Sequence, residues 1–335
     1  MSGSRIVGVV LAALLTGGAS TSALADTPPS RWDRARDPAV GAAWDLHARV
    51  CEFTAPIAKE VLGLHELRLQ QARSELEAAD AGASADVRLR FDLGHVYEEL
   101  KHSQQAIDVL QPALAMAPDH PAAAEAWIDL GFAYAHLDKS REERDAYDAY
   151  LARTPDGPGR ATALLDRAEA EMRLGHLDDA VLGYRDTIDV CDTSSVLNDL
   201  FDVGVLARWG LAVALDRAGD ATGGAREALL ATQLDPKAEI LNGPDTFFVP
   251  EYERDWYMGL GRIEHAKQES EPRKAAVLWG VVEKTWADYA TNADPKDRWL
   301  SLAKAHLATA QKRRAAVEKR ARLRPPSAGG ERLIE

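Results

Sequence analysis

The chain has 335 residues, and its 40 lysine and arginine side chains are outnumbered by 53 aspartate and glutamate side chains, so its formal net charge is −13. This acidic balance argues against a nucleic-acid-binding protein, because binding to phosphates requires a basic surface. Hydrophobic residues make up 46% of the chain and charged residues 28%, which is the composition of a folded protein. Two cysteines are too few for a disulfide scaffold or a four-thiolate zinc site.

Residues 1–25 have the layout of a secretory signal peptide. Arg5 lies in a short positive region, residues 6–15 are apolar, and Ala23 and Ala25 form a small-x-small cleavage site. The apolar stretch spans about ten residues, whereas a membrane-spanning helix needs about twenty. We therefore expect cleavage after Ala25 and no transmembrane segment in the remaining chain. The protein is expected to be exported, with the periplasm favoured over release outside the cell.

The rest of the chain is predicted to be helical, because no alternating strand pattern of useful length is present. In chain order, the predicted segments are a disordered N-terminus at 26–38, an N-terminal helix pair at 39–86, four repeats at 87–236, a loop at 237–250, a degenerate repeat with a C-terminal capping helix at 251–323, and a disordered tail at 324–335. Asp294 and Pro295 are predicted to be the N-cap and the first residue of the last helix.

Two segments in the middle of the chain share one pattern. Residues 90–118 and 127–155 both contain D-L-G-x-x-Y and both end on proline. Equivalent residues, such as Asp92 and Asp129, lie 37 positions apart. Two weaker copies follow, so the four predicted unit starts are Val87, Ala124, Ala161 and Val205.

This pattern resembles the tetratricopeptide repeat, a 34-residue helix-turn-helix unit. The matching residues are Leu93, Gly94, Tyr97, Ala106, Ala113 and Pro118 in the first unit and Trp127, Leu130, Gly131, Tyr134, Tyr147 and Pro155 in the second. The second unit departs from the family at two small positions, which hold Glu143 and Tyr150. The resemblance implies an all-α, right-handed superhelical solenoid of antiparallel helix pairs. Gly94 and Gly131 are expected to admit the partner helix, and Pro118 and Pro155 to end the second helices.

In this family the first helices of successive units line a concave groove that commonly holds a peptide. Carried onto this sequence, the groove positions are Arg88, Phe91, Asp92, His95, Glu98 and Glu99 in the first unit, Glu125, Ile128, Asp129, Phe132, Ala135 and His136 in the second, Thr162, Leu165, Asp166, Glu169, Met172 and Arg173 in the third, and Leu206, Trp209, Gly210, Val213, Asp216 and Arg217 in the fourth. Three aspartates, one in each of the first three units, form an acidic ladder beside an apolar row. Either the ladder helps to bind a partner segment with basic and apolar side chains, or it is a solvated face.

Other features of the sequence do not mark a catalytic, cofactor or metal site. The chain lacks G-x-S-x-G, P-loop and G-x-G-x-x-G motifs. His95 and His136 could face each other across the groove, but solvated or packed histidines are the favoured interpretation. Cys51 and Cys191 are expected to be buried thiols rather than a disulfide, because solenoid units contact only their neighbours.

Phe247 and Phe248 lie in the predicted loop between two prolines. They are candidates for a partner contact, with packing under the neighbouring helices as the alternative. Taken together, the sequence predicts a non-enzymatic exported scaffold that binds a protein or peptide partner in its groove. One alternative is a structural subunit of an envelope assembly that docks through its convex face or C-terminal helices. A repeat-built enzyme or small-molecule binder is the third reading.

Overall fold

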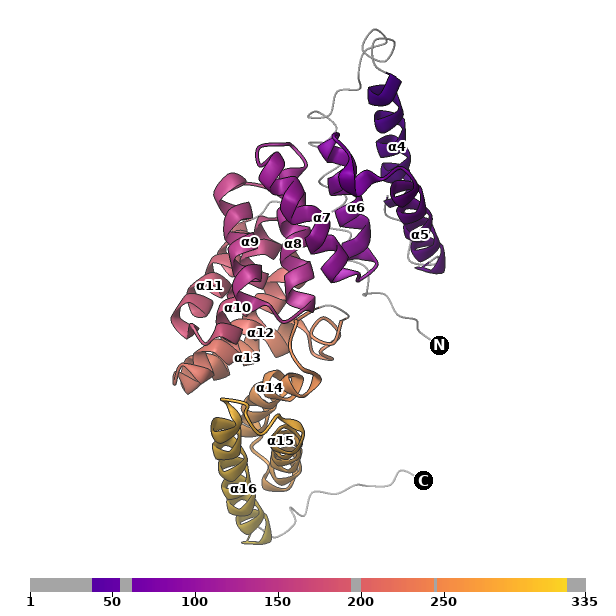
Figure 1. Cartoon of the computed structure of the whole chain (residues 1–335). Coiled ribbons are helices and arrows are strands. Elements are labelled where there is room, and N and C mark those ends of the chain that lie inside the picture. The colour runs from indigo at the N-terminus through magenta and orange to yellow at the C-terminus, as the bar shows by residue number, and fades with distance from the viewer. Residues whose placement is uncertain (1–37, 55–61, 194–199, 244–245, 324–335) are drawn as a thin grey trace. The chain divides into compact units, whose positions relative to one another are not determined.

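The computed structural model describes residues 38–54, 62–193, 200–243 and 246–323 (Figure 1). Within these residues the structure contains thirteen α-helices, two short 3-10 turns and no strand. Helices that follow one another in the chain pack against one another as pairs, so the predicted all-α fold of consecutive helix pairs is confirmed. The predicted signal peptide at 1–25 and the tail at 324–335 lie outside the described residues. No helix among the described residues is both long enough and apolar enough to span a membrane.

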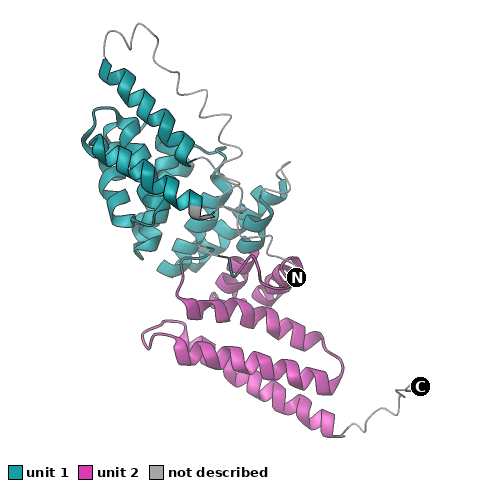
Figure 2. Ribbon diagram, turned by 90° about the vertical axis from the view of Figure 1, so that its right-hand side faces the viewer, with its two compact units in different colours: residues 1–207, 242–248 teal, residues 208–241, 249–335 magenta. Residues whose placement is uncertain are grey.

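The chain divides into two compact units, which Figure 2 draws in teal and magenta. Unit 1 contains the residues up to Ala207 together with 242–248, and unit 2 contains 208–241 and the residues from Val249 onward. The boundary falls inside a single helix, α12 (Phe201–Arg217). The sequence pattern did not predict this division, because nothing interrupts the helical pattern there.

Unit 1 is a series of helix pairs. Its complete helices are α4 (Pro38–Thr54), α5 (Leu62–Ala78), α6 (Val87–Glu99), α7 (Ser103–Met116), α8 (Ala123–His136), α9 (Ser140–Arg153), α10 (Arg160–Leu174) and α11 (Leu177–Thr193). The first helices α6, α8 and α10 begin within one residue of the predicted unit starts. The first helix of the fourth unit, α12, begins four residues before the predicted start at Val205.

Glycine and proline act in unit 1 as the repeat pattern implies. Gly94 of α6 packs directly on Leu110 of α7, and Gly131 of α8 packs on Tyr147 of α9. A Cβ atom on Gly131 would lie only 2.5 Å from a ring carbon of Tyr147, so any larger side chain would push the helices apart. Helices α7 and α9 each end two residues before a proline, which cannot continue a helix.

The turn inside each of the four repeats contains one residue with left-handed backbone. These residues are Lys101 (φ 60°), Asp138 (φ 55°), Gly175 (φ 88°) and Gly219 (φ 94°). They lie 37, 37 and 44 positions apart, which are the spacings of the predicted unit starts. The same turn therefore recurs four times, although only the last two copies use glycine, the residue that adopts this conformation without strain.

Unit 2 consists of the second part of α12 and the helices that follow. These are α13 (Ala221–Leu234), α14 (Arg254–Gln268), α15 (Pro272–Asn292) and α16 (Leu300–Leu323). Its core is aromatic: Trp256 of α14 and Trp286 of α15 are fully buried with ring centroids 5.2 Å apart, and His306 of α16 stacks on Trp286 at 4.4 Å. Asp216 accepts a hydrogen bond from Trp256 Nε1 at 3.0 Å and lies 2.9 Å from His306 Nε2, which joins three helices.

The last helix begins later than the sequence predicted. Asp294 and Pro295 do not open it, and α16 starts at Leu300. The Asp294 carboxylate accepts a hydrogen bond from the Lys296 amide at 2.7 Å, and Asp297 accepts one from the Trp299 amide at 2.8 Å. These two successive aspartate turns compete with the helical hydrogen bonds and delay the helix by five residues.

Both cysteines keep their thiols rather than forming a disulfide. Cys51 lies on α4 and is exposed, with its sulfur 3.7 Å from His47 Nε2. Cys191 lies near the end of α11, is half-buried, and packs beside Gly204 of α12. The expectation that both thiols are buried was therefore wrong for Cys51, because α4 presents that side chain to solvent.

Candidate partner-binding face

The side of unit 1 formed by the predicted groove positions of α6, α8 and α10 is called the first-helix face below. Its apolar row is largely inaccessible, since Phe91, Ile128 and Leu165 are only 4%, 6% and 2% exposed. Ile128, for example, belongs to a packed cluster with Tyr150 of the following helix. These side chains hold successive helices together and do not present a continuous apolar surface to a partner.

The predicted acidic ladder forms contacts between successive first helices. An oxygen of Asp92 lies 2.7 Å from Nδ1 of His47 on α4, and an oxygen of Asp129 lies 3.1 Å from Nδ1 of His95 on α6. Asp129 is only 5% exposed. The two aspartates thus join neighbouring helices, a role that differs from both sequence-based readings. His47 was not recognised as a partner, because α4 lies before the first repeat and carries no repeat signal.

These histidines are held in their protonated form. The hydrogen bond to Asp92 raises the pKa of His47 to about 10. Burial alone would lower the pKa of His95, but the charge of Asp129 and the hydrogen bond to it raise that pKa well above its ordinary value. Each aspartate on α6 and α8 therefore faces a positive charge from the preceding first helix.

Three acidic groups of this face are not buried: Glu125 of α8 is exposed, and Glu99 and Asp92 of α6 are half-buried. We call these three residues the acidic patch. Glu125 is exposed, yet desolvation raises its pKa and the surrounding carboxylates add to the increase. Burial alone would raise the pKa of Glu99, but a hydrogen bond from His65 lowers it below its ordinary value.

Glu98, beside the acidic patch, is a buried carboxyl group. It is 5% exposed, and two basic side chains lie near it, with Lys101 Nζ and His136 Nδ1 each 3.9 Å from one of its oxygens. Burial raises the pKa of Glu98 to about 8, and the neighbouring Asp129 carboxylate contributes to this increase. At neutral pH this group therefore carries a proton for most of the time and adds little to the negative charge of the face.

A second, more deeply buried polar cluster joins the second and third repeats. Glu143 and Glu169 are fully buried, and the Arg173 guanidinium lies between them, bonded to Glu143 and 3.6 Å from an oxygen of Glu169. Burial raises the pKa values of Glu143 and Asp166 well above their ordinary range. Glu143, one of the two departures from the family pattern, is therefore the partner of Arg173.

The loop aromatics belong to this part of the face. Phe247 is 8% exposed, and the Phe248 amide donates a hydrogen bond to Glu169 Oε1 at 2.6 Å. The half-buried Phe248 ring packs against His136, with ring centroids 4.9 Å apart, and against Phe132, with centroids 6.2 Å apart. The sequence left open whether the loop aromatics contact a partner or pack on helices, and the structure shows Phe248 packed on helices of unit 1.

Trp209, a predicted groove position of the fourth unit, lies in unit 2. It is 2% exposed, and its ring packs over Gly261 of α14. The structure thus places Trp209 in the packing between α12 and α14 of unit 2.

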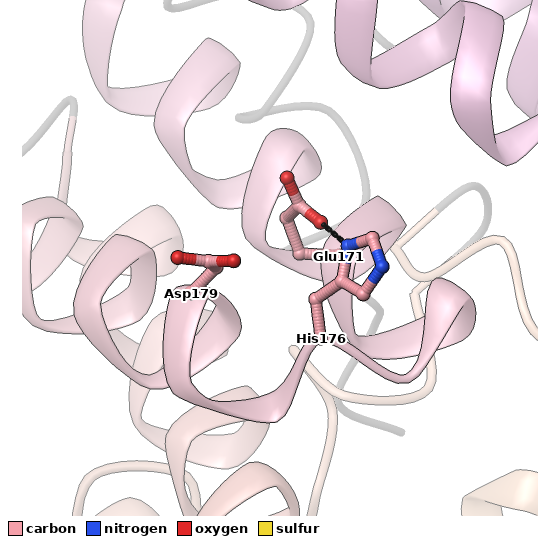
Figure 3. Close-up of side chains that lie close together, drawn as sticks. All are labelled: Glu171, His176 and Asp179. Carbon is pink, nitrogen blue, oxygen red and sulfur yellow. Dashed lines mark hydrogen bonds and ion pairs between the residues drawn. The ribbon is translucent and has the colours of Figure 1, made fainter.

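The histidines named from the sequence do not form a metal-binding pair. His95 is bonded to Asp129, whereas His136 Nδ1 lies 2.8 Å from the backbone oxygen of Phe132. Among the described residues, one group of three potential metal ligands lies close together, formed by Glu171, His176 and Asp179 (Figure 3).

Two guanidinium groups make the Glu171 site unsuitable for a cation. Arg144 and Arg167 approach the same oxygen of Glu171 to 3.8 and 3.9 Å. The other oxygen is 2.6 Å from His176 Nδ1, as Figure 3 shows. Glu171 is already surrounded by positive groups, so we assign no metal to this cluster.

A hollow of about 540 Å³ lies on a different surface of unit 1, among α7, α8 and α9. Trp127 and Tyr134 form part of its wall, and the Arg153 guanidinium lies 5.3 Å from the centre of the Trp127 ring. It is a second accessible surface with aromatic residues, separate from the acidic patch.

Comparison with known proteins identifies the repeat. Residues 87–120 match the family model of the tetratricopeptide repeat. Among solved structures, the chain is similar to a tetratricopeptide repeat protein from Parabacteroides merdae ATCC 43184, with 15% sequence identity, a TM-score of 0.48, and coverage of 85% of this chain and 95% of that one. No curated protein matches the chain. The matched residues comprise α6, α7 and the turn after them, so this helix pair is a tetratricopeptide repeat, and the same turn recurs at the spacings of the predicted units in the next three helix pairs.

Proposed function

We propose that the protein is a non-enzymatic scaffold that binds a protein or peptide partner on the first-helix face of unit 1. Tetratricopeptide repeats generally mediate contacts between proteins. The observation that carries the proposal is the acidic patch, in which Glu125 is exposed and Glu99 and Asp92 are half-buried, whereas the other acidic side chains of the face are buried. Export, proposed from the layout of residues 1–25, would place this interaction in the periplasm or outside the cell.

The partner is proposed to be a segment with basic and apolar side chains. Lysine or arginine would approach the exposed Glu125, and Glu99, which His65 contacts at 3.5 Å, would add to the negative charge there. Partial desolvation strengthens such an ion pair relative to one in bulk water, because the surrounding medium has a lower dielectric constant.

A binding titration with the full chain tests this proposal. The probe is a fluorescein-labelled peptide in which lysine alternates with leucine, and the control peptide carries glutamate in place of lysine. We expect only the lysine peptide to bind, and its affinity to fall as salt is added. Replacing Glu99 and Glu125 together by glutamine should weaken binding about tenfold, whereas Glu142→Gln on the exposed side of α9 should not change it.

The double variant separates the acidic patch from other charged surfaces. Asp92 and Asp129 are less suitable for this purpose, because their histidine partners would be left buried without a counter-charge. If the double variant retains its helical content and binds the lysine peptide as tightly as the unaltered protein, the acidic patch is not the binding surface.

A second candidate function is docking into a larger assembly through unit 2. Val277 and Val281 of α15 lie one helical turn apart and are 68% and 43% exposed, which is unusual for valine side chains in a folded protein. Replacing both with serine would prevent assembly under this alternative and leave binding of the lysine peptide unchanged. Loss of peptide binding in the valine variant would argue against two separate surfaces.

A further inference from the structure

One part of the first-helix face is already occupied by another part of the same chain. Phe248 comes from the segment after α13, yet its ring packs on α8 and its amide bonds to α10, which lie far earlier in the sequence. Thr246 and Phe247 are each 8% exposed. The occupied surface is formed by Phe132, His136 and Glu169, and we call it the Phe248 site.

The contacts at the Phe248 site are those that a bound peptide makes. The Phe248 backbone amide donates its hydrogen bond to a fully buried carboxylate, and such a bond is independent of the side-chain identity. The aromatic ring of Phe248 contacts Phe132 and His136, and this contact selects the side chain. Backbone recognition together with one side-chain pocket is the usual division of roles in the binding of extended peptides.

The acceptor at this site is held in place before any segment binds. Arg173 lies 3.6 Å from Glu169 on the same helix and is fixed by its bond to Glu143 of α9. A carboxylate that is ordered in advance loses little conformational entropy on accepting the amide. The ring of Phe248 is only half-buried, so an aromatic side chain of another segment can replace it without opening the buried core.

We propose that the Phe248 site binds an extended peptide segment that carries an aromatic side chain, and that residues 246–248 are its resident occupant. A partner segment must displace Phe248 to bind there. This inference rests on the proposed function, because it adds an aromatic-specific subsite beside the acidic patch. A tethered occupant competes at an effective concentration on the order of 1 mM, so removal of its ring should strengthen partner binding.

The test uses the full chain and a fluorescein-labelled peptide with the sequence of residues 242–250. The receptor variants are Phe248→Ala, which empties the site, and Phe201→Ala, which removes an exposed phenylalanine elsewhere in unit 1. We expect the peptide to bind the Phe248→Ala protein at least about tenfold more tightly than the unaltered protein. The Phe201→Ala protein should behave as the unaltered protein does, and a peptide with alanine at position 248 should bind poorly to every receptor.

Equal affinity of the peptide for the unaltered and Phe248→Ala proteins would overturn the proposal, as would no binding to a Phe248→Ala protein that keeps its helical content. If that variant does not fold, hydrogen exchange of the Phe248 amide in the unaltered protein gives the answer. Faster exchange with about 1 mM unlabelled peptide supports displacement, and unchanged exchange contradicts it. If the peptide of residues 242–250 neither binds nor displaces Phe248 while the lysine peptide still binds, the proposal of the Phe248 site is wrong and binding through the acidic patch is unaffected.

Discussion

Lys101 shows how a single residue can be strained by the repeat to which it belongs. Its backbone has a φ of 60°, and the equivalent position in the last two repeats is glycine. A non-glycine residue pays about 1–2 kcal/mol in this conformation, because its Cβ crowds the following carbonyl. The repeat retains the turn geometry even where the residue type does not favour it, since the packing of the two helices determines that geometry.

We therefore predict that Lys101→Gly stabilises the protein by about 0.5–1 kcal/mol, the relief of strain being partly offset by the flexibility of glycine in the unfolded chain. Gly175→Ala is the matched variant in the third repeat and should destabilise by about 1 kcal/mol or more. Urea denaturation followed by circular dichroism measures both changes. A lower midpoint for Lys101→Gly would show that the lysine side chain contributes more than its backbone costs.

The partners of the ladder aspartates could not be predicted at the residue scale. The repeat spacing placed Asp92, Asp129 and Asp166 at equivalent positions, but their surroundings differ. Asp92 and Asp129 meet histidines of the preceding helix, whereas the residue equivalent to His95 in the second repeat is Phe132. Repetition predicts where a backbone position recurs, and it does not predict which side chain of a neighbouring element will face it.

At the scale of the helices, replacing a glycine by alanine is expected to have opposite effects on stability at different positions. Gly131 lies against the fully buried Tyr147 ring, whereas Gly280 of α15 has only the end of the Arg314 side chain nearby, 3.7 Å from where a Cβ would lie. Both glycines occupy the interior of a helix, where alanine is intrinsically preferred. The neighbouring helix therefore determines whether alanine is tolerated at position 131, whereas helix propensity determines it at position 280.

Gly131→Ala should consequently destabilise the protein by about 1–3 kcal/mol, because the Tyr147 ring has no space into which to move. Gly280→Ala should stabilise it by about 0.5–1 kcal/mol through helix propensity alone. The two thermal unfolding midpoints should shift in opposite directions. If Gly131→Ala is tolerated as well as Gly280→Ala, then α8 and α9 can separate at little cost.

Helix pairing was predictable from the sequence because its signals are local and steric. A proline after a helix end acts on the preceding turn, as Pro118 illustrates, and a glycine at a close approach acts on the next helix of its own pair, as Gly94 does on Leu110. The start of α16 was not predictable, because it depends on whether a second aspartate turn forms at Asp297 before the helix begins. The boundary between the units, inside α12, depends on which helices pack together and leaves no mark in the local pattern.

At the scale of the whole molecule, buried groups with raised pKa values make stability depend on pH. The folded state retains a proton on Glu98 between the ordinary pKa of 4.5 and the folded pKa of about 8. The corresponding interval for His47 runs from 6.5 to about 10. In these intervals the folded state binds more protons than the unfolded state, so each contribution is complete below the ordinary pKa and is lost as the pH rises through the folded pKa.

We predict that the free energy of unfolding decreases as the pH is raised from about 6 to 9, and that Glu98→Gln makes this decrease smaller. Denaturant titrations across this range provide the measurement, and Glu142→Gln, at an exposed position, should leave the slope unchanged. The charged and titratable groups that face Glu98 are Asp129, Lys101, Glu99, His95 and His136. Stability that rises with pH in this range would contradict the assignment of Glu98 as protonated in the folded state.

The candidate site was predictable in part. The repeat register selected the helices that form the first-helix face, including the positions of Glu99 and Glu125. It did not show that Phe91, Ile128 and Leu165 would be buried between helices, because accessibility depends on how closely the pairs pack. Nor did it show that Phe248 would lie on Glu169, 79 residues earlier in the chain.

The most direct test of partner binding on the first-helix face is site-specific photocrosslinking in intact producing cells. A photoreactive benzoylphenylalanine is placed at position 125 in one strain and at position 142 in another, and the crosslinked peptides are identified by mass spectrometry. We predict that position 125 captures a partner segment rich in basic and apolar residues and that position 142 does not. Crosslinks to the same partner from position 142, with none from position 125, would contradict binding through the acidic patch.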